Sequence, residues 1–354
     1  MAMQKTWIGL ALLAATAMAA PAASAVTPGK VQLFTDWTVG CDNKLDCQAV
    51  ALMDAQAPEV YLSVVVTRPG GPGTLLTINM STPSPKAGRY SVRVDGKTVI
   101  RSVALAADKP VQLTGAEAIR LARAMARGNV IRMFDENGAE VGKASLAGAS
   151  AALRYMDAQQ DRAGVRNAVV ATSGRPRPGK LVALPVITAR KITPTDMLPD
   201  TSALVALSEA SPCAAERFGS TEDTAYSLGS GKDGPRALVL LNCGAGAYNF
   251  SSGIYTARRD SKGTWTFEPA KFDYDAIGLT ADSQIPLLIN VDWDAATQTI
   301  GSYNKGRGLG DCGSSTSYVW DGEMFRLTAA SLMTECRGST DWIPIWRADV
   351  RLTD

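Results

Sequence analysis

The residues that most suggest chemistry lie in KGRGLGDCGSS, residues 305–315, where four glycines surround Arg307 and Asp311. From Gly308 to Gly313 the spacing is G-x-G-x-x-G, which in dinucleotide-binding proteins places a pyrophosphate at the N-terminus of a helix. An arginine and an aspartate beside such a loop could contact a phosphate and a ribose. The fingerprint has this meaning only when a strand precedes it and a helix follows it.

The segments around the glycines do not meet that condition. Residues 297–304 are typical of a strand, but residues 314–327 are β-branched and aromatic and turn at Asp321-Gly322, which predicts a hairpin. We therefore predict no dinucleotide cofactor and interpret the glycines as turn positions of positive φ beside a disulfide. Arg307 and Asp311 remain candidate ligand contacts.

The chain contains no histidine among its 354 residues. This excludes Ser-His-Asp and Cys-His catalysis, histidine-based zinc sites and the usual proton shuttle near neutral pH. Two D-x-D pairs, Asp273/Asp275 and Asp292/Asp294, resemble fragments of calcium loops but lack the further oxygen ligands that calcium needs. We interpret them as turn residues and predict no metal, no cofactor and no catalytic residue; the alternative is a carboxylate pair facing one cleft.

The chain has six cysteines, an even number, and all of them follow the N-terminal segment. None of them forms a C-x-x-C motif. An even number of cysteines in an exported chain predicts structural disulfides, although the sequence alone leaves several pairings open. Proximity along the chain favours pairing in sequential order. The pairs would be Cys41–Cys47, Cys213–Cys243 and Cys312–Cys336.

The first 25 residues have the features of a secretory signal peptide. Lys5 precedes an apolar stretch from Trp7 to about Ala20, and Ala23-Ser24-Ala25 is an A-x-A cleavage pattern. The apolar stretch is shorter than a transmembrane helix requires, and Pro21 follows it directly, so we do not interpret it as a membrane span. We predict a periplasmic or secreted protein, cleaved near Ala25, with no membrane span.

The remaining sequence predicts a mainly β protein with minor α (α+β) in two β-sandwich-like or meander domains, the first closed by two helices. Residues 26–172 form a predicted N-terminal β-rich domain, in which basic groups outnumber acidic ones. Residues 173–199, rich in proline and basic residues, are a predicted linker. Residues 200–354 are predicted as an all-β domain with an acidic balance, and a short candidate helix near residues 202–210 comes before its strands.

The two helices of the first domain are predicted from changes in hydrophobic period. Thr114 to Glu117 forms a capping-box pattern before AEAIRLARAMAR, and Gly128 follows as a predicted C-cap. A second helix is predicted over about residues 148–162. Basic residues on a separate face of the first helix are candidate anion contacts, although a basic stripe is usually only a solvated face. These residues are Arg120, Arg123 and Arg127.

Five tryptophans fall in the C-terminal half. Aromatic rings there could stack on sugars, but large β domains also bury tryptophan, and we favour burial. The five are Trp265, Trp293, Trp320, Trp342 and Trp346.

Several segments together resemble an exported bacterial family known only as a domain of unknown function, the 1176 family. The front of the chain, up to about Asp161, also resembles the invasion-associated locus B family, but it lacks a second cysteine pair between Val50 and Ala168. Neither resemblance implies catalytic residues. The segments that carry it are FTDWTVGCDNKLDCQAV (34–50), YMDAQQDRAG (155–164), CGAGAYN (243–249), KGRGLGDCG (305–313) and WDGEMFRL (320–327).

The function favoured by these observations is non-catalytic. We predict a binding or envelope-associated module, whose partner is an unknown envelope ligand or protein and not a nucleic acid. The alternatives are a histidine-independent carboxylate hydrolase acting on cell-envelope glycans, and a host-interaction factor.

Overall fold

The computed structural model describes residues 26–53, 61–83, 86–106, 109–170, 173–217, 222–275 and 284–354. The predicted signal peptide lies outside these ranges. The described chain is mostly β, with three α-helices, which confirms the predicted fold class. None of the described helices is long and apolar enough to cross a membrane.

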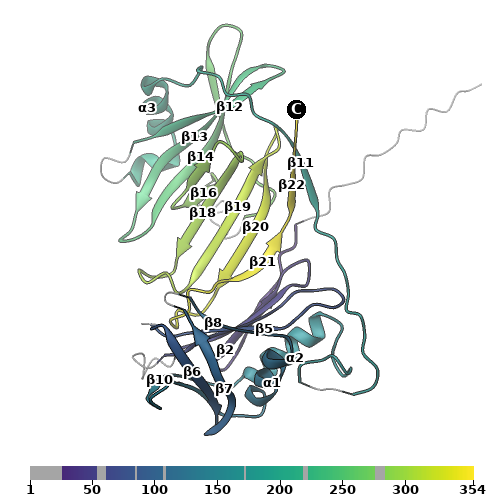
Figure 1. The fold of residues 1–354 in the computed structure, drawn as a ribbon. Helices are drawn as coiled ribbons and strands as arrows, with labels where there is room; N and C mark the ends of the chain where they lie inside the picture. Colours follow the sequence, from purple (N-terminus) through teal and green to yellow (C-terminus); the bar gives the residue numbers. More distant parts are fainter. Residues whose placement is uncertain are drawn as a thin grey trace, which may run out of the picture.

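Two antiparallel sheets form the N-terminal half (Figure 1, purple to teal). Strands such as β6 and β9 alternate buried and more exposed side chains, whereas β2 is buried throughout and β3 and β4 are buried at most positions. The six-stranded sheet runs β1 (Val31–Phe34), β2 (Trp37–Cys41), β3 (Cys47–Ala51), β4 (Ser63–Arg68), β5 (Thr77–Ser81), β8 (Val111–Thr114). The four-stranded sheet runs β10 (Glu140–Ser145), β9 (Val130–Phe134), β6 (Gly88–Val94), β7 (Lys97–Leu105).

Two helices share one core with both sheets. The apolar stripe of α1 (Gly115–Met125) buries Leu121 and Met125 completely. This helix begins where the capping pattern predicts, but Thr114 makes no side-chain cap hydrogen bond and Ala126 is the C-cap, so the predicted capping box and Gly128 cap are wrong in detail. Gly128 instead allows close packing, because a Cβ there would lie 2.3 Å from Val94 Cγ1.

The second predicted helix is α2 (Ala149–Gln159), shorter than expected at both ends. Its N-cap, Gly148, has φ of 97° and leaves no room for a side chain, since a Cβ would lie 1.7 Å from the Phe34 carbonyl oxygen. The chain therefore enters α2 against the end of β1, and this position requires glycine.

Two further sheets pack face to face in the C-terminal half (Figure 1, green and yellow). Leu238, Ile254, Tyr318 and Phe325 fill the space between them. One sheet runs β12 (Thr224–Gly231), β13 (Gly234–Ala245), β14 (Phe250–Arg259), β15 (Trp265–Pro269), with β16 (Leu287–Ile289) also paired to β14. The other runs β17 (Asp292–Asp294), β18 (Thr299–Lys305), β19 (Gly313–Trp320), β20 (Phe325–Met333), β21 (Ile343–Arg347).

The segment described as all-β also contains helical structure. Helix α3 (Thr201–Ala210) and the short 3-10 helix η2 (Pro212–Ala215) pack on the outer face of β13, where Leu204 is buried. The short helix predicted near residues 202–210 is thus present, and the all-β description needs this correction. Asp200 caps α3 by accepting a hydrogen bond from the Ala203 amide at 2.9 Å.

The predicted linker is not wholly without secondary structure. Within it, β11 (Val186–Arg190) pairs in parallel with the last strand, β22 (Asp349–Thr353). The proline- and glycine-rich character of residues 173–180 gives no signal for this pairing, since it joins segments at opposite ends of the C-terminal half. The predicted domain boundaries themselves remain a prediction.

The two halves are in direct contact. Val50 of β3, Val65 of β4 and Leu52, directly after β3, belong to the core cluster of the C-terminal sheets. Beside them, Arg347 of β21 forms ion pairs with Asp42 and Asp46, which lie in the disulfide-closed loop between β2 and β3.

Candidate functional site

The glycine-rich segment is a β-hairpin turn between β18 and β19. A strand follows it, as predicted, and Gly310 and Gly313 have φ of 67° and 136°. A Cβ at Gly313 would lie 1.9 Å from the Asn304 carbonyl oxygen, so glycine is needed for the turn itself. The segment therefore has the geometry of a turn and lacks a helix N-terminus for a pyrophosphate.

The structure brings the two candidate ligand contacts of this turn together as an ion pair. Arg307 donates from Nε to Asp311 at 2.7 Å, and the buried Asp311 carboxylate also accepts from the Gly338 amide at 2.7 Å. The hydrogen bond from Arg307 holds the pKa of Asp311 below its usual value. Asp311 is thus committed to joining two turns, while the Arg307 side chain stays 41% exposed.

All six cysteines form disulfides in the sequential order that we predicted. Cys41–Cys47 closes the loop between β2 and β3, and Cys213–Cys243 joins η2 to β13. Cys312–Cys336 joins the β18–β19 turn to the segment after β20.

The three candidate arginines of α1 do not act together. Arg120 is exposed and pairs with Glu117 at 3.3 Å, and Arg127 is exposed at the end of the helix. Arg123 instead turns to the segment after α2 and donates to the Val169 carbonyl at 3.2 Å. At most two of the three side chains remain available to an external anion.

Of the D-x-D residues, Asp294 holds the turn between β17 and β18, as predicted, whereas Asp273 does not hold a turn and bonds to an amide of strand β20. Asp294 accepts from the Ala296 amide at 2.8 Å and from the Thr297 hydroxyl at 2.7 Å, and Asp273 accepts from the Leu327 amide at 2.8 Å. Within the described ranges, no group of three or more acidic or cysteine side chains is placed to hold a metal ion.

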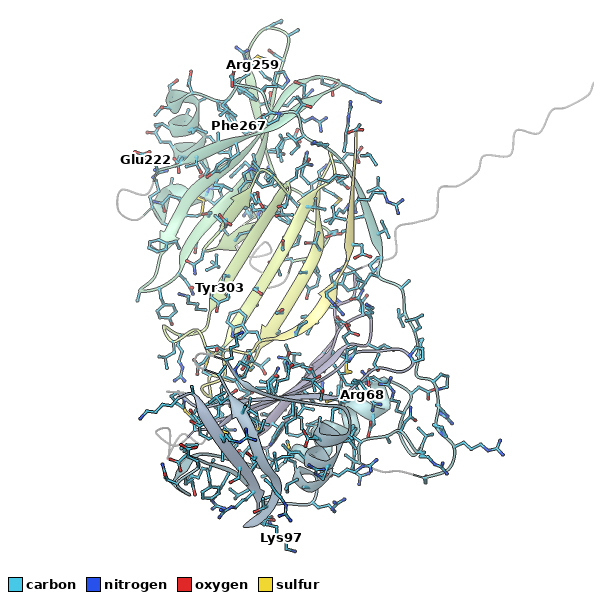
Figure 2. The ribbon with its side chains drawn as sticks, in the orientation of Figure 1. Arg68, Lys97, Glu222, Arg259, Phe267 and Tyr303 are labelled. Atoms are coloured by element: carbon cyan, nitrogen blue, oxygen red, sulfur yellow. A yellow bond between two sulfur atoms is a disulfide. The ribbon has the colours of Figure 1, made fainter. Side chains whose placement is uncertain are left out.

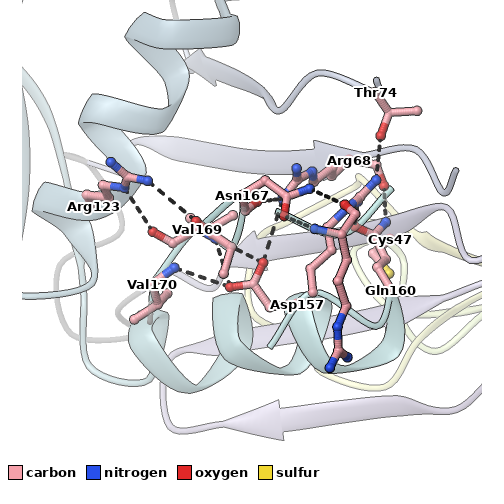
Figure 3. Close-up of polar contacts among 12 residues, drawn as sticks. Cys47, Arg68, Thr74, Arg123, Asp157, Gln160, Asn167, Val169 and Val170 are labelled. Atoms are coloured by element: carbon pink, nitrogen blue, oxygen red, sulfur yellow. Dashed lines mark hydrogen bonds and ion pairs between the residues drawn. The ribbon is translucent and has the colours of Figure 1, made fainter. Parts of the chain in front are cut away.

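The segment YMDAQQDRAG forms a buried polar network that the sequence did not reveal (Figure 3). Asp157 accepts from the amides of Val169 and Val170 and lies 3.7 Å from Arg68 Nη1. Gln160 donates from Nε2 to the carbonyls of Leu45 and Arg68, at 2.8 and 2.7 Å. These contacts tie α2 to β4 and to the loop before β3.

Ionisation in this network is set by burial. Burial raises the pKa of Asp157 against the lowering effect of its backbone hydrogen bonds and of Arg68, and burial together with Arg162 lowers the pKa of Arg68 to about 10. A carboxyl group with a raised pKa is a signature of a catalytic acid. Here the group is 2% exposed and bonded to backbone amides, which makes it part of the scaffold.

A groove of about 580 Å³ opens at the end of the C-terminal sandwich that holds the β12–β13 and β19–β20 turns. It exists because the inner face of the first sheet continues as polar residues beyond the apolar core. In Figure 2, Arg259 and Phe267 mark this end of the sandwich, and Tyr303 lies toward the other. Trp320 and Met324 contribute apolar surface to the groove.

Two arginines face the groove from adjacent strands. Arg236 of β13 and Arg258 of β14 are directly opposite in the antiparallel register, so both side chains lie on the same face of the sheet. Like charges at such positions destabilise a sheet. Arg236 is anchored by a hydrogen bond to the Gly322 carbonyl. Arg258 is exposed and, among the described residues, forms no ion pair or side-chain hydrogen bond.

Carboxylates flank this arginine pair. Asp233 comes from the β12–β13 turn, Glu323 from the β19–β20 turn and Glu268 from β15, opposite Thr256. All three are exposed, and no ion pair within 4.0 Å joins any of them to a cation of the described chain. Lys271 adds a third cation to the lining. The groove thus presents unneutralised charges of both signs within one concavity.

None of these groove residues belongs to a motif that can be recognised in the sequence, apart from Trp320, Glu323 and Met324, which lie in the segment WDGEMFRL. The alternation of β13 and β14 places Arg236 and Arg258 on one face each, but only the pairing register shows that they are opposite each other. Of the five tryptophans for which we favoured burial, Trp320 is buried and lines the groove. The other four are half-buried. The signal available in the sequence was one arginine on the inner face of each strand, Arg236 in β13 and Arg258 in β14.

The chain belongs to the family described as "Protein of unknown function (DUF1176)", which it matches over residues 31–349. The uncharacterized protein YpfG of Escherichia coli (strain K12) is 24% identical over 335 residues, covering 88% of this chain and 91% of that protein. The crystal structure of invasion associated protein b from Bartonella henselae matches 36% of this chain and 96% of its own, at 14% identity and a TM-score of 0.28. The latter likeness is too low to support an argument.

Proposed function

We propose that the protein is an extracytoplasmic, non-catalytic binding protein that holds a small zwitterionic ligand, an amino acid or a short peptide, in the groove of the C-terminal sandwich. The observation that carries the proposal is the cross-strand pair Arg236 and Arg258, flanked by carboxylates and without an ion-pair partner in the described chain. Such an arrangement costs stability unless another charge compensates it.

The ligand class follows from the sign of the charges. Two guanidinium groups side by side offer forked donors to a carboxylate. Asp233, Glu268 and Glu323 line the same groove and offer acceptors to an ammonium group. A purely anionic ligand would be repelled by the carboxylates and a purely cationic one by the arginines, so a ligand that carries both charges fits best.

The compartment is part of the proposal. Three disulfides that leave no free cysteine are typical of proteins that fold outside the cytoplasm. Together with the signal-peptide features of residues 1–25, they support a periplasmic or secreted location.

The glycan-hydrolase alternative has less support. A glycosidase uses a carboxylic acid with a raised pKa facing a second carboxylate. Among the described residues, the carboxyl groups with a raised pKa are those of Asp157 and Asp273, which do not line the groove and accept backbone hydrogen bonds. No observation favours the host-interaction alternative.

Isothermal titration of the exported, oxidised protein with amino acids, dipeptides and peptidoglycan stem peptides tests the proposal, with a thermal-shift screen first. A ligand at 100 times its Kd stabilises by about 2.7 kcal/mol and raises Tm by roughly 5–10 °C. Arg258→Ala is expected to weaken binding at least tenfold, since it removes a charged hydrogen-bond donor to the ligand (about 1.5–3 kcal/mol).

Arg101→Ala is the matched control. Arg101 is likewise exposed on a strand, β7, but lies in the N-terminal half. Binding that survives Arg258→Ala, or that Arg101→Ala weakens equally, would place the site elsewhere. A screen without any binding of zwitterions would overturn the proposed ligand class, and turnover of a bound peptide would overturn the non-catalytic role.

A further inference from the structure

The opposite end of the C-terminal sandwich carries an exposed apolar surface that the groove does not use. Four side chains from two hairpins form it, and we call it the hairpin patch: Tyr248, Phe250, Tyr303 and Leu309, which are 36%, 51%, 39% and 72% exposed. Tyr248 and Phe250 come from the β13–β14 turn and the start of β14. Tyr303 and Leu309 come from the end of β18 and the β18–β19 turn. In Figure 2, Tyr303 lies at this end of the sandwich.

Asparagine side chains lock the two hairpins together. Asn249 donates from Nδ2 to the Lys305 carbonyl at 2.8 Å, and Asn290 donates to the Tyr303 carbonyl and to Asn249 Oδ1, both at 2.9 Å. The Tyr248 hydroxyl donates to the Gly306 carbonyl at 3.1 Å. The patch is therefore preorganised, and little conformational entropy is lost when a partner covers it.

Packing supports the patch from below. The ring of Trp342 stacks on Tyr303 at a centroid distance of 4.5 Å, and Trp342 Nε1 donates to the Gly310 carbonyl at 3.1 Å. A Cβ at Gly306 would lie 2.6 Å from Cys312 Sγ, so glycine lets the turn pass close to its disulfide. The disulfide and the glycines hold Leu309 outward at the tip.

Cations border the apolar tip. Lys305 Nζ lies 6.0 Å over the Tyr303 ring and forms no ion pair in the described chain. Arg307 is held in place by the buried Asp311, with its side chain partly in solvent. An apolar tip, tyrosines beside it and flanking cations reproduce the layers of an anionic bilayer surface: acyl chains, interface and phosphates.

We propose that the hairpin patch docks the protein on an anionic phospholipid bilayer, with Leu309 and Phe250 entering the acyl boundary and Lys305 and Arg307 contacting headgroup phosphates. Leu309 and Phe250 carry no hydrogen-bonding group, which favours lipid over a sugar chain as the occupant. The proposal is independent of the groove, because the two surfaces lie at opposite ends of the sandwich.

Co-sedimentation of the full exported protein with large vesicles tests the docking. The vesicles contain phosphatidylglycerol and phosphatidylethanolamine, and pure phosphatidylcholine vesicles serve as the neutral reference. Binding to the anionic vesicles that falls with added salt is expected. Leu309→Asp is expected to lower the partition coefficient at least about tenfold, because burial of one leucine side chain is worth roughly that factor. Phe250→Ser is expected to act in the same direction.

Leu181→Asp is the matched control. Leu181 is 73% exposed, as exposed as Leu309, but belongs to the segment between the two halves. It should leave vesicle binding unchanged. The proposal is overturned if the protein does not bind anionic vesicles, if Leu309→Asp binds like the parent, or if Leu181→Asp loses as much. Binding to isolated peptidoglycan that Leu309→Asp abolishes, without vesicle binding, would assign the patch to a glycan instead.

Discussion

Arg347→Met is expected to destabilise the protein by removing one of the ion-pair clusters that join its two halves. The guanidinium of Arg347 pairs with Asp42, whose side chain is completely buried, and with Asp46, whose side chain is 26% exposed. Its backbone amide also donates to Asn43 Oδ1 at 2.8 Å, a bond that the substitution leaves in place.

The magnitude follows from these burials. After the substitution Asp42 keeps its hydrogen bonds from the Lys44 and Asp46 amides, both 2.9 Å, but has lost its charged partner. A hydrogen bond to a buried charged group contributes about 1.5–3 kcal/mol. The half-exposed pair with Asp46 is screened by solvent and adds about 0–1 kcal/mol. Adding the two ranges, we expect a loss of about 1.5–4 kcal/mol.

Urea unfolding followed by near-ultraviolet circular dichroism measures this loss as a lower midpoint. Arg351→Met is the control, because Arg351 lies four positions later, on the exposed strand β22, without an ion pair in the described chain. In an Arg347→Met background, Asp46→Asn should cost less than it does alone. A loss for Arg347→Met no greater than that of Arg351→Met would refute the view that this ion pair holds the halves together.

Three further predictions concern the scaffold. Gly148→Ala should unfold α2 from β1 and lower Tm by several degrees, because its Cβ would clash with the Phe34 carbonyl, whereas Gly138→Ala, with open space around it, should cost far less in the same thermal melt. Asp311→Asn should remove an acid-sensitive contribution: the Arg307 hydrogen bond lowers the pKa of Asp311 below 3.8 in the folded state, so its stabilisation is present above that pH and is lost as the pH falls through the lowered value. Unfolding midpoints of variant and parent should therefore converge in acid, and a constant difference would contradict the assignment. Replacing the Cys213–Cys243 pair by alanines should cost about 3.7 kcal/mol and the Cys41–Cys47 pair about 2.4, since the chain-entropy effect grows with loop length; urea titrations that give the opposite order would contradict this.

Local features of the fold were predictable because their signals lie within short segments. The disulfides join cysteines that are neighbours in the sequence order. The glycines of the 305–315 turn were recognised because a hairpin, and not a helix, follows them. Helix α1 was found from its apolar period, although the capping pattern at Thr114 did not form the expected hydrogen bond.

The candidate site was not predictable because it depends on pairing between distant strands. Arg236 and Arg258 become neighbours only through the β13–β14 register, which is displaced by an irregularity between Asn242 and Ala245. No local pattern encodes that displacement. The pairing of β11 with β22 is similarly non-local, since a parallel partner cannot be read from the hydrophobic pattern of either strand.

The separation of the two proposed surfaces has a consequence for how they would work together. The groove lies beside the β12–β13 and β19–β20 turns, whereas the hairpin patch lies at the β13–β14 and β18–β19 turns, at the other ends of the same strands. A protein seated on a bilayer through Leu309 would therefore keep its groove in water, so lipid and ligand should not compete. Equal ligand affinity with and without anionic vesicles is expected in a titration, and competition between them would show that the ligand and the lipid occupy one surface.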